Sequence, residues 1–447
     1  MADPGVDDPG AGHRRLGRVG DSLARWLSPP APERPQVAEQ PAEAVLDLLR
    51  HLGVAMVRAG DPVDRVTVIL EDVARTYAAR GVRFFVLPTG VFVRIETGEE
   101  TSQVDFAPAS SSQLRLDQVD ALYRLVDDIR HAKVSVGEAT DRLDDLLASQ
   151  PRMPGWVRVI GAALLTVGLG LMLNPALVAL PAYVVLGAGV GLLTVWADRS
   201  AGVAIVLPVV ASFAVTWAAF ELARPTLDLW PLDVVIPPLV TLLPGAALTM
   251  ATIELSAGSM LSGSARLVYG LQRLLLLAFG ITLGIELAGL PGHDIGADTL
   301  GAWAAWVGVL VFALGHYLHS SVPGRSLPWL VLVLYVAYAA QTIAGALMGS
   351  LGGSFVAGVV LLPLAYAIQE RPSGPPVAVI FLPTFWMLVP GALGLEGVTE
   401  LVGADSAAGL GDFLNALLVI VAIAAGVLVG AGVSERFGRA TGSWRGL

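Results

Sequence analysis

Apolar residues in the first third of the chain recur about every 3.6 positions, which predicts amphipathic helices. The apolar stripes cover residues 42–59, 61–77, 114–131 and 136–149, and polar residues occupy the opposite faces. A glycine follows each of the first two stripes, where a helix commonly ends. We therefore expect helices at these positions, with their charged side chains facing solvent.

A β-rich stretch separates the second and third helices. Residues 83–87 and 91–96 are rich in Val, Phe and Ile, and Pro88-Thr89-Gly90 between them predicts a hairpin turn. A third run, residues 103–106, is suited to pair with this hairpin. Helices and strands together predict a small cytoplasmic α+β domain over residues 41–152.

From Trp156 onward the pattern changes to apolar segments long enough to cross a bilayer. This part predicts a polytopic α-helical membrane protein with ten transmembrane helices. The expected spans are residues 156–174, 176–197, 201–222, 232–255, 265–290, 300–320, 327–348, 352–369, 377–400 and 410–433.

Basic residues between the spans predict the orientation. One set of alternating loops holds Arg152, Arg158, Arg199, Arg266, Arg325, Arg371, Arg436, Arg439 and Arg445, whereas the other holds only Arg224. The positive-inside rule then places both termini in the cytoplasm and the protein in the cell membrane. Residues 1–40, rich in Asp, Gly, Arg and Pro, predict a disordered tail, and residues 434–447 a cytoplasmic C-terminal tail.

Composition narrows the function classes. The net charge is −10, so nucleic acid is an unexpected partner. The chain has no cysteine and no G-x-x-x-x-G-K-[ST] motif, which excludes thiolate metal sites, cysteine nucleophiles and a Walker A site. We expect no enzyme activity and no cofactor. The polar residues of the N-terminal helices show no metal-ligand spacing, and we interpret them as charged helix surface: His51, Asp61, Asp64, Glu71 and Asp72.

One span is interrupted. Within Leu232–Gly270, Pro237, Pro238 and Pro244-Gly245 break a run of membrane length, and such backbone is tolerated in a bilayer only where protein or a water-filled cavity satisfies it. A broken helix at membrane depth is therefore a candidate binding site.

The interrupted stretch recurs 146 residues later. In this register the pairs are Pro237 with Pro383, Pro244-Gly245-Ala246 with Pro390-Gly391-Ala392, Glu254-Leu255 with Glu400-Leu401, and Gly263 with Gly409. The copies fall in spans four and nine, which cross in opposite directions. This predicts two inverted five-helix repeats with discontinuous helices, residues 153–292 and 293–433. Pro208 and Pro363 match at an offset of 155, which predicts a shorter loop in the second repeat.

Polar and broken-helix positions form the expected substrate site. We expect backbone groups to be freed at Pro244, Gly245, Pro390 and Gly391. Freed amides would attract the carboxylate of an amino acid and freed carbonyls its ammonium group. The alternative is that these residues only kink the helices for packing. We add three side chains: Ser256, Ser259 and Arg266. For the serines the alternative is close helix packing, and for Arg266 it is a positive-inside anchor or an ion pair with Glu254.

Acidic residues near the spans are candidates for proton coupling. Burial in a membrane raises a carboxyl pKa, so Glu254, Glu400 and Glu286 could carry a proton. The alternative is a water-accessible place near a span end. His316 and His319, at the end of a span, are expected at the membrane interface instead.

These segments also resemble a known family. AMVRAGDPVDRVTVILEDVA, FFVLPTGVFVRI, PLVTLLPGAALTMATIELSAGSMLSGSARLVYG and PTFWMLVPGALGLEGVTEL occur in the order found in the bacterial threonine/serine exporter family, over about residues 40–433. The resemblance implies a secondary transporter that exports threonine and serine, driven by the proton motive force. Its partners would be the amino acid, protons and the lipid bilayer. Whether the protein forms a homo-oligomer is left open. A ligand sensor or a channel regulated by the cytoplasmic domain is the alternative.

Overall fold

The fold is described from a computed structural model. It describes residues 41–79, 81–96, 102–109, 113–198, 201–223, 231–289, 300–371, 373–388 and 406–441. Three predicted site residues, Pro390, Gly391 and Glu400, lie outside the described residues, as do the expected N-terminal tail, residues 1–40, and residues 442–447 of the expected C-terminal tail.

The N-terminal part, residues 41–149, contains the predicted helices and strands. The helices are α2 (Ala42–Arg58), α3 (Val63–Thr76), α4 (Leu116–Arg130) and α5 (Val136–Ala148). The strands β1 (Arg83–Leu87), β2 (Gly90–Glu96) and β3 (Ser102–Pro108) form an antiparallel sheet in the order β1-β2-β3. These elements confirm the predicted helical periodicity and the hairpin.

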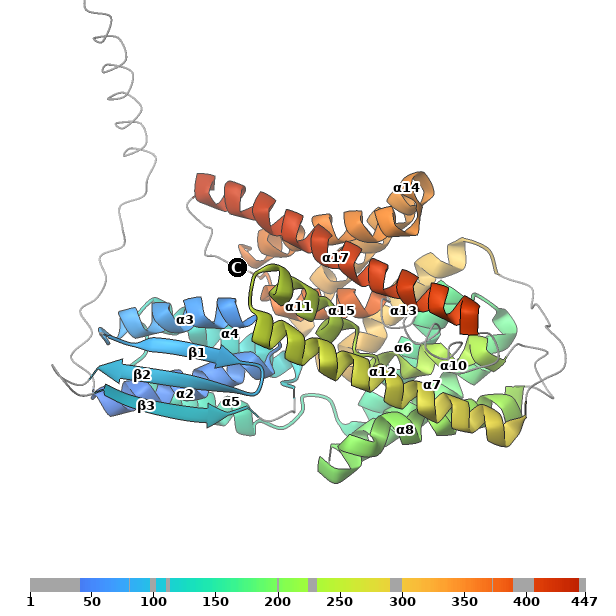
Figure 1. The fold of residues 1–447 in the computed structure, drawn as a ribbon, viewed down its shortest axis with the longest axis horizontal. Helices are drawn as coiled ribbons and strands as arrows, with labels where there is room; N and C mark the ends of the chain where they lie inside the picture. Colours follow the sequence, from blue (N-terminus) through green and yellow to red (C-terminus); the bar gives the residue numbers. More distant parts are fainter. Residues whose placement is uncertain are drawn as a thin grey trace, which may run out of the picture.

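Alternation along the strands explains how this part packs. Val91 and Val93 of β2 are fully buried, whereas Phe85 and Phe106 of the neighbouring strands are exposed. The inner face of the sheet lies against α2 and α3, and α4 and α5 pack beside these helices (Figure 1). The apolar stripes of the four helices therefore bury against one core.

The helices that follow are long and apolar. They are α6 (Gly155–Leu173), α7 (Leu180–Ala197) after the short helix η1 (Leu177–Ala179), and α8 (Ala201–Ala218), which continues as a π-helical turn, η2 (Ala219–Ala223). Further along are α12 (Met260–Ala288), α13 (Trp303–His319), α15 (Val377–Met387) and α17 (Ser406–Thr441). The first five of these helices, α6, α7, α8, α12 and α13, begin and end close to predicted spans. α17 extends to Thr441, beyond its predicted end at residue 433, and residues 389–400 of the span predicted at α15 lie outside the described residues.

Two breaks interrupt the apolar helices: the expected one at Pro244-Gly245, and one at Gly349, between two predicted spans. α10 (Pro231–Leu239) and η3 (Val240–Leu242) are followed by α11 (Gly245–Ser256), and the two arms are bent by 58°. α14 (Leu327–Gln369), which follows η4 (Gly324–Ser326), contains a break at Gly349, whose φ of 79° is readily adopted by glycine alone. Near that break the chain folds back, since a Cβ atom placed on Gly353 would lie 3.0 Å from the backbone of Gly345.

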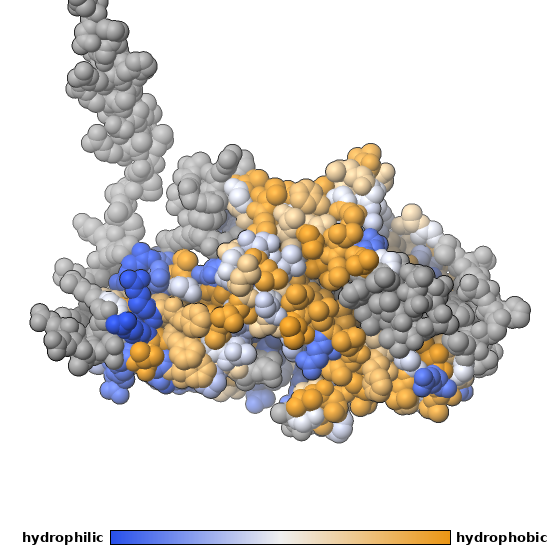
Figure 2. Space-filling view, in the orientation of Figure 1, coloured by the Kyte–Doolittle hydropathy of each residue, from blue (hydrophilic) through white to orange (hydrophobic). Residues whose placement is uncertain are grey.

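The apolar helices indicate a multi-pass membrane protein. Among the described residues, six helices are long and apolar enough to cross a bilayer, or seven if the bent pair counts as one span. α13 and α15 are shorter apolar helices. Hydrophobic side chains cover the surface of the helices that follow α5, while hydrophilic ones gather on the N-terminal part (Figure 2). The count of ten spans stays a prediction.

α6 and α13 pack through a reciprocal pair of glycine contacts. A Cβ atom placed on Gly161 would lie 2.9 Å from the carbonyl oxygen of Gly315, and one on Gly315 would lie 2.9 Å from that of Gly161. Gly168 and Gly308 have the same relationship, at 2.8 and 2.7 Å. Because the earlier glycine of one helix meets the later glycine of the other, the helices are antiparallel and their backbones touch without intervening side chains.

Another kind of glycine contact occurs at two places in the chain, and the residues of the two places are separated by a constant number of positions. On α12, a Cβ atom placed on Gly280 would meet the carbonyl oxygen of Val209 on α8 and the backbone nitrogen of Phe213. On α17, one placed on Gly426 would meet the carbonyl oxygen of Phe355 on α14 and the backbone nitrogen of Val359. Each residue of the second set follows its counterpart by 146 positions.

The packed residues of α8 and α14 correspond at an offset of 146, whereas the sequence match of Pro208 with Pro363 implies an offset of 155. The proline match, like the repeat itself, stays a prediction.

Candidate functional site

The break at Pro244-Gly245 lies inside the protein. Pro244 is the N-cap of α11 and Gly245 its first residue, and both are buried. The structure confirms that one half-helix ends and another begins here. α11 and the start of α12 then lie beside α3 of the N-terminal part (Figure 1).

Glu254, near the end of α11, is buried and paired. Its side chain is 1 % exposed, and Oε2 accepts a hydrogen bond of 3.0 Å from Nε of Arg266. Oε1 accepts a bond of 3.2 Å from the backbone N–H of Val63, the first residue of α3. Of the alternatives stated for Glu254, the water-accessible place is therefore wrong. The ion pair between Glu254 and Arg266, which was one of the alternatives for Arg266, is present.

The contact with Val63 satisfies a helix terminus. The first amides of a helix have no partner within it, and the N-cap of α3 is Pro62, which has no side-chain acceptor. The Glu254 carboxylate supplies that acceptor, and its negative charge lies at the positive end of the α3 dipole. One carboxylate thus joins α11 and α12 to the N-terminal part.

Two further polar contacts reinforce the junction. Nη2 of Arg266 donates to the carbonyl oxygen of Asp61 at 3.0 Å. The hydroxyl of Ser259 lies 2.8 Å from both carboxylate oxygens of Asp64 and donates to them. The structure therefore brings together the predicted residues Glu254, Ser259 and Arg266, and it adds Asp61 and Asp64, whose position at the junction was not expected.

Asp61 differs most from its sequence interpretation. We interpreted it as charged helix surface, but the residue is only 3 % exposed. The hydroxyl of Tyr123 donates to Oδ1, while Oδ2 is buried without a hydrogen-bond partner. Burial raises the pKa of Asp61, and the nearby Arg65 charge opposes that rise. The surface interpretation is wrong here because Asp61 lies in the α2–α3 turn, against the membrane helices.

Arg65 provides a positive charge on the same side of α3. It is half-buried, and its guanidinium lies over the ring of Tyr123 at 5.2 Å from the centroid. Burial lowers its pKa, but Tyr123 and Asp61 outweigh burial and raise the pKa above the ordinary value, so this group stays cationic. No hydrogen bond or ion pair of the Arg65 guanidinium occurs among the described residues.

A pocket of about 540 Å³, counting open solvent, lies at this junction. Asp61 and Arg65 line it from the N-terminal part, and α11, α14, α15 and α17 supply its other walls. The lining residues are Ala59, Gly60, Asp61, Pro62, Arg65, Met250, Ile253, Leu362, Val377, Ala378, Phe381, Leu382, Val427 and Leu428. The pocket is therefore apolar, with one carboxylate and one guanidinium at its N-terminal wall.

Other predicted residues lie away from this pocket. Ser256 is exposed, and its hydroxyl donates to the carbonyl oxygen of Thr252 within α11. Glu286 is exposed near the end of α12. His316, expected at the membrane interface, is instead buried between Phe312 and Trp386, and neither ring nitrogen has a hydrogen-bond partner.

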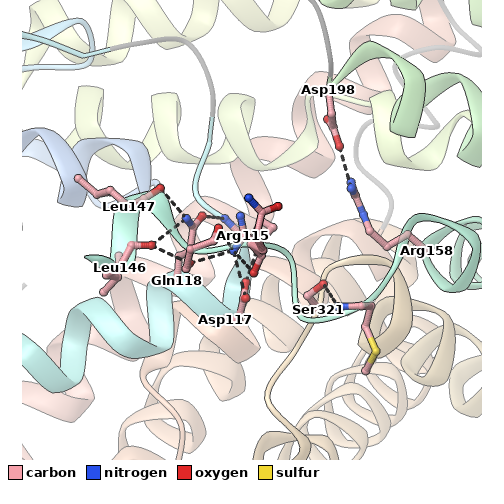
Figure 3. Close-up of polar contacts among 11 residues, drawn as sticks. Arg115, Asp117, Gln118, Leu146, Leu147, Arg158, Asp198 and Ser321 are labelled. Atoms are coloured by element: carbon pink, nitrogen blue, oxygen red, sulfur yellow. Dashed lines mark hydrogen bonds and ion pairs between the residues drawn. The ribbon is translucent and has the colours of Figure 1, made fainter. Parts of the chain in front are cut away.

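A second polar contact joins the N-terminal part to the membrane helices. The fully buried Asp120 of α4 binds Arg325 of η4 at 2.7 Å and Arg124 at 2.6 Å. Around the connection to α6, Arg115 binds Asp117 and the chain after α5, and Ser321 accepts from the backbone N–H of Met153 (Figure 3). Long-range contacts rather than local patterns hold this junction together.

Comparison with known proteins identifies the family. The model of the family described as "Putative threonine/serine exporter" matches residues 47–288, which is more than half of the chain. The chain belongs to this family. The matched region runs from α2 to the last residue of α12 and so includes the broken span, Glu254 and Arg266.

Curated relatives of this exporter family occur in fungi. A pheromone-regulated membrane protein 10 of Eremothecium gossypii is 28% identical over 271 residues, which cover 57% of this chain and 36% of the relative. Its namesake in Candida albicans is 25% identical over 329 residues, covering 68% and 29%. The chain thus spans about a third of the length of the curated relatives it matches. No solved structure matches it.

The family and the apolar helices give one coarse functional statement. The chain is a multi-pass membrane protein of a transport family. Local sequence signals that could have identified Asp61 are weak, because Asp-Pro after Gly is also an ordinary helix start.

Proposed function

We propose that this protein is a secondary active transporter that exports small hydroxy amino acids, threonine and serine, from the cytoplasm at the expense of the proton motive force. The observation that carries the proposal is the span broken at Pro244-Gly245, with its arms bent by 58°, in a chain of this exporter family. Discontinuous helices are the usual means by which secondary transporters bind a solute at membrane depth.

The proposed architecture is an inverted repeat of residues 153–292 and 293–433. Two packing features support it. The contact of α12 with α8 has a counterpart between α17 and α14 at an offset of 146 residues, and this is also the offset of the two proline-broken stretches. The antiparallel contact of α6 with α13 is reciprocal, as expected where equivalent helices meet across a two-fold axis in the membrane plane.

The remaining predictions are retained as parts of the proposal. Residues 41–152 are the cytoplasmic domain, both termini face the cytoplasm, and the protein resides in the cell membrane. Glu254 is proposed to couple solute movement to protons by weakening its contacts with Arg266 and α3 when it is protonated, since both donate to its carboxylate. Glu400 and Glu286 remain candidate coupling residues, and Pro390-Gly391 remains the second half of the substrate site.

Transport by purified protein tests the proposal. In proteoliposomes loaded with threonine, we expect counterflow of labelled threonine and serine, and net efflux that increases with an imposed proton gradient and stops when an uncoupler is added. Flux that ignores the gradient would refute proton coupling. The absence of flux for every small amino acid would refute the exporter function.

A ligand sensor is the second candidate, because the N-terminal part contributes both charged groups of the pocket. This candidate predicts that the full-length protein binds an amino acid but catalyses neither counterflow nor efflux. Any flux of the amino acid would exclude the sensor. Flux that saturates with the amino-acid concentration would also exclude a channel.

A further inference from the structure

The pocket at the junction contains two charges of opposite sign whose hydrogen-bonding capacity is only partly used. Oδ2 of Asp61 is buried without a hydrogen bond, and the guanidinium of Arg65 makes none among the described residues. Both residues line the pocket. They do not form a direct ion pair with each other, so each retains the capacity to bind a third group.

Such an arrangement is costly without an occupant. A buried carboxylate oxygen that lacks a donor loses its hydration and gains nothing in return. Tyr123 satisfies only Oδ1, and it contacts Arg65 through its ring rather than through an acceptor atom. A ligand that carries both a group with several N–H donors and a carboxylate would satisfy the two residues at once: the donors would bind Asp61 and the carboxylate would bind Arg65.

We infer that this pocket binds a small α-amino acid as its zwitterion, with the ammonium group on Oδ2 of Asp61 and the carboxylate on the guanidinium of Arg65. Arginine suits the second role because its planar group donates two parallel hydrogen bonds to a carboxylate. The inference rests on the proposed function and deepens it: the N-terminal part is a wall of the substrate site, not only a regulatory module.

The other walls determine which side chains fit. Met250 and Ile253 come from α11, Phe381 and Leu382 from α15, and Val427 and Leu428 from α17. None of the lining side chains carries a hydroxyl or an amide. An apolar pocket discriminates poorly between a methyl group and an isosteric hydroxyl. Valine should therefore bind about as well as threonine.

Ligand binding to the purified full-length protein tests both charges. We expect labelled threonine to bind, valine to compete within about threefold, and neither threonine amide nor N-acetylthreonine to compete, because each lacks one charge. Asp61→Asn and Arg65→Gln should each weaken threonine binding roughly tenfold or more. Glu71→Gln is the matched control, since Glu71 is an exposed residue of α3 that does not line the pocket.

A labelling assay covers the case in which these variants fail to fold. The chain has no cysteine, so Ala378→Cys places a single thiol in the pocket, and Ala148→Cys places one at the exposed end of α5. Threonine and valine should slow maleimide labelling of the first variant and leave the second unchanged. Equal labelling of Ala378→Cys with and without saturating threonine would overturn the inference.

The outcomes separate this inference from the proposed function. If Asp61→Asn and Arg65→Gln fold, export threonine and keep the wild-type KM, the pocket is not the substrate site and the exporter function stands. If wild-type protein neither binds nor transports any amino acid, the proposed function fails as well.

Discussion

Glu254 accepts a hydrogen bond from the backbone N–H of Val63, which precedes it by 191 residues and begins helix α3. The same carboxylate accepts from Nε of Arg266 at 3.0 Å. Because one side chain joins α3, α11 and α12, its charge determines how firmly the N-terminal part is held against the membrane helices.

Replacing Glu254 with Gln should destabilise the protein. The change leaves the Arg266 guanidinium, whose side chain is only 14% exposed, without a counter-charge, and breaking a buried pair costs on the order of 3 kcal/mol. The measurement is the thermal unfolding midpoint in detergent. Glu286→Gln is the control, since Glu286 is exposed and should leave the midpoint unchanged. An unaltered midpoint in Glu254→Gln would contradict this account.

The contact of Asp120 with Arg325 should contribute more than that of Asp120 with Arg124. Arg325 comes from η4 and crosses the junction, whereas the Arg124 side chain is 58% exposed on the same helix as Asp120. Double-mutant cycles with Asp120→Asn should give a coupling of about 1–3 kcal/mol for Arg325→Gln. The coupling between Asp120→Asn and Arg124→Gln should be about 0.5 kcal/mol or less. Equal couplings would show that the junction does not depend on this pair.

The glycine contacts should not tolerate a methyl group. A Cβ atom on Gly168 would overlap the backbone of Phe312, so Gly168→Ala should cost about 1–3 kcal/mol of stability. Gly189→Ala on α7 is the control, because a Cβ atom there meets nothing within 4 Å. If the repeat is real, Gly280→Ala and Gly426→Ala should have similar effects. A large difference between these two variants would count against their equivalence.

Threonine binding should weaken on acidification. The ammonium group of threonine binds the ionised form of Asp61. Burial raises the pKa of this carboxyl above 3.8, the ordinary aspartate value. The affinity for threonine should therefore fall as the pH drops through that raised pKa. The titratable and charged groups that face Asp61 are Arg65, Tyr123, Arg266 and Tyr366. Binding titrations from pH 8 to pH 4 test this.

The control for the pH dependence is Asp61→Asn. Its residual threonine binding should not change over the range in which the wild type loses affinity. If the variant keeps the wild-type pH profile, another group is responsible for it.

Much of the fold could be predicted because its signals are local. The period of apolar residues gave the helices of the N-terminal part, and Pro244-Gly245 marked the broken span, since proline removes a backbone donor wherever it occurs. The alternative roles of Glu254 could not be distinguished in this way. Its partners Val63 and Arg266 lie on other elements, and a pattern along one helix does not show what packs against it.

The pocket was missed for the same reason. Asp61 follows Gly60 and precedes Pro62, a sequence that fits an exposed helix start as well as a buried junction. Its carboxylate is buried at the junction because Tyr123 of α4 binds it and helices distant in the sequence form the other walls of the pocket. His316 was similarly assigned to the membrane interface from its place at a helix end, whereas Phe312 and Trp386 enclose it.

The two glycine pairs of α6 and α13 also constrain how the protein can move. Where backbones touch without side chains between them, the helices have no groove along which to slide and no flexible atoms to compress. Movement of one proposed half against the other must therefore pivot about these two points of contact or separate them. We expect this helix pair to act as a fulcrum, so that displacements grow with distance from Gly161 and Gly168.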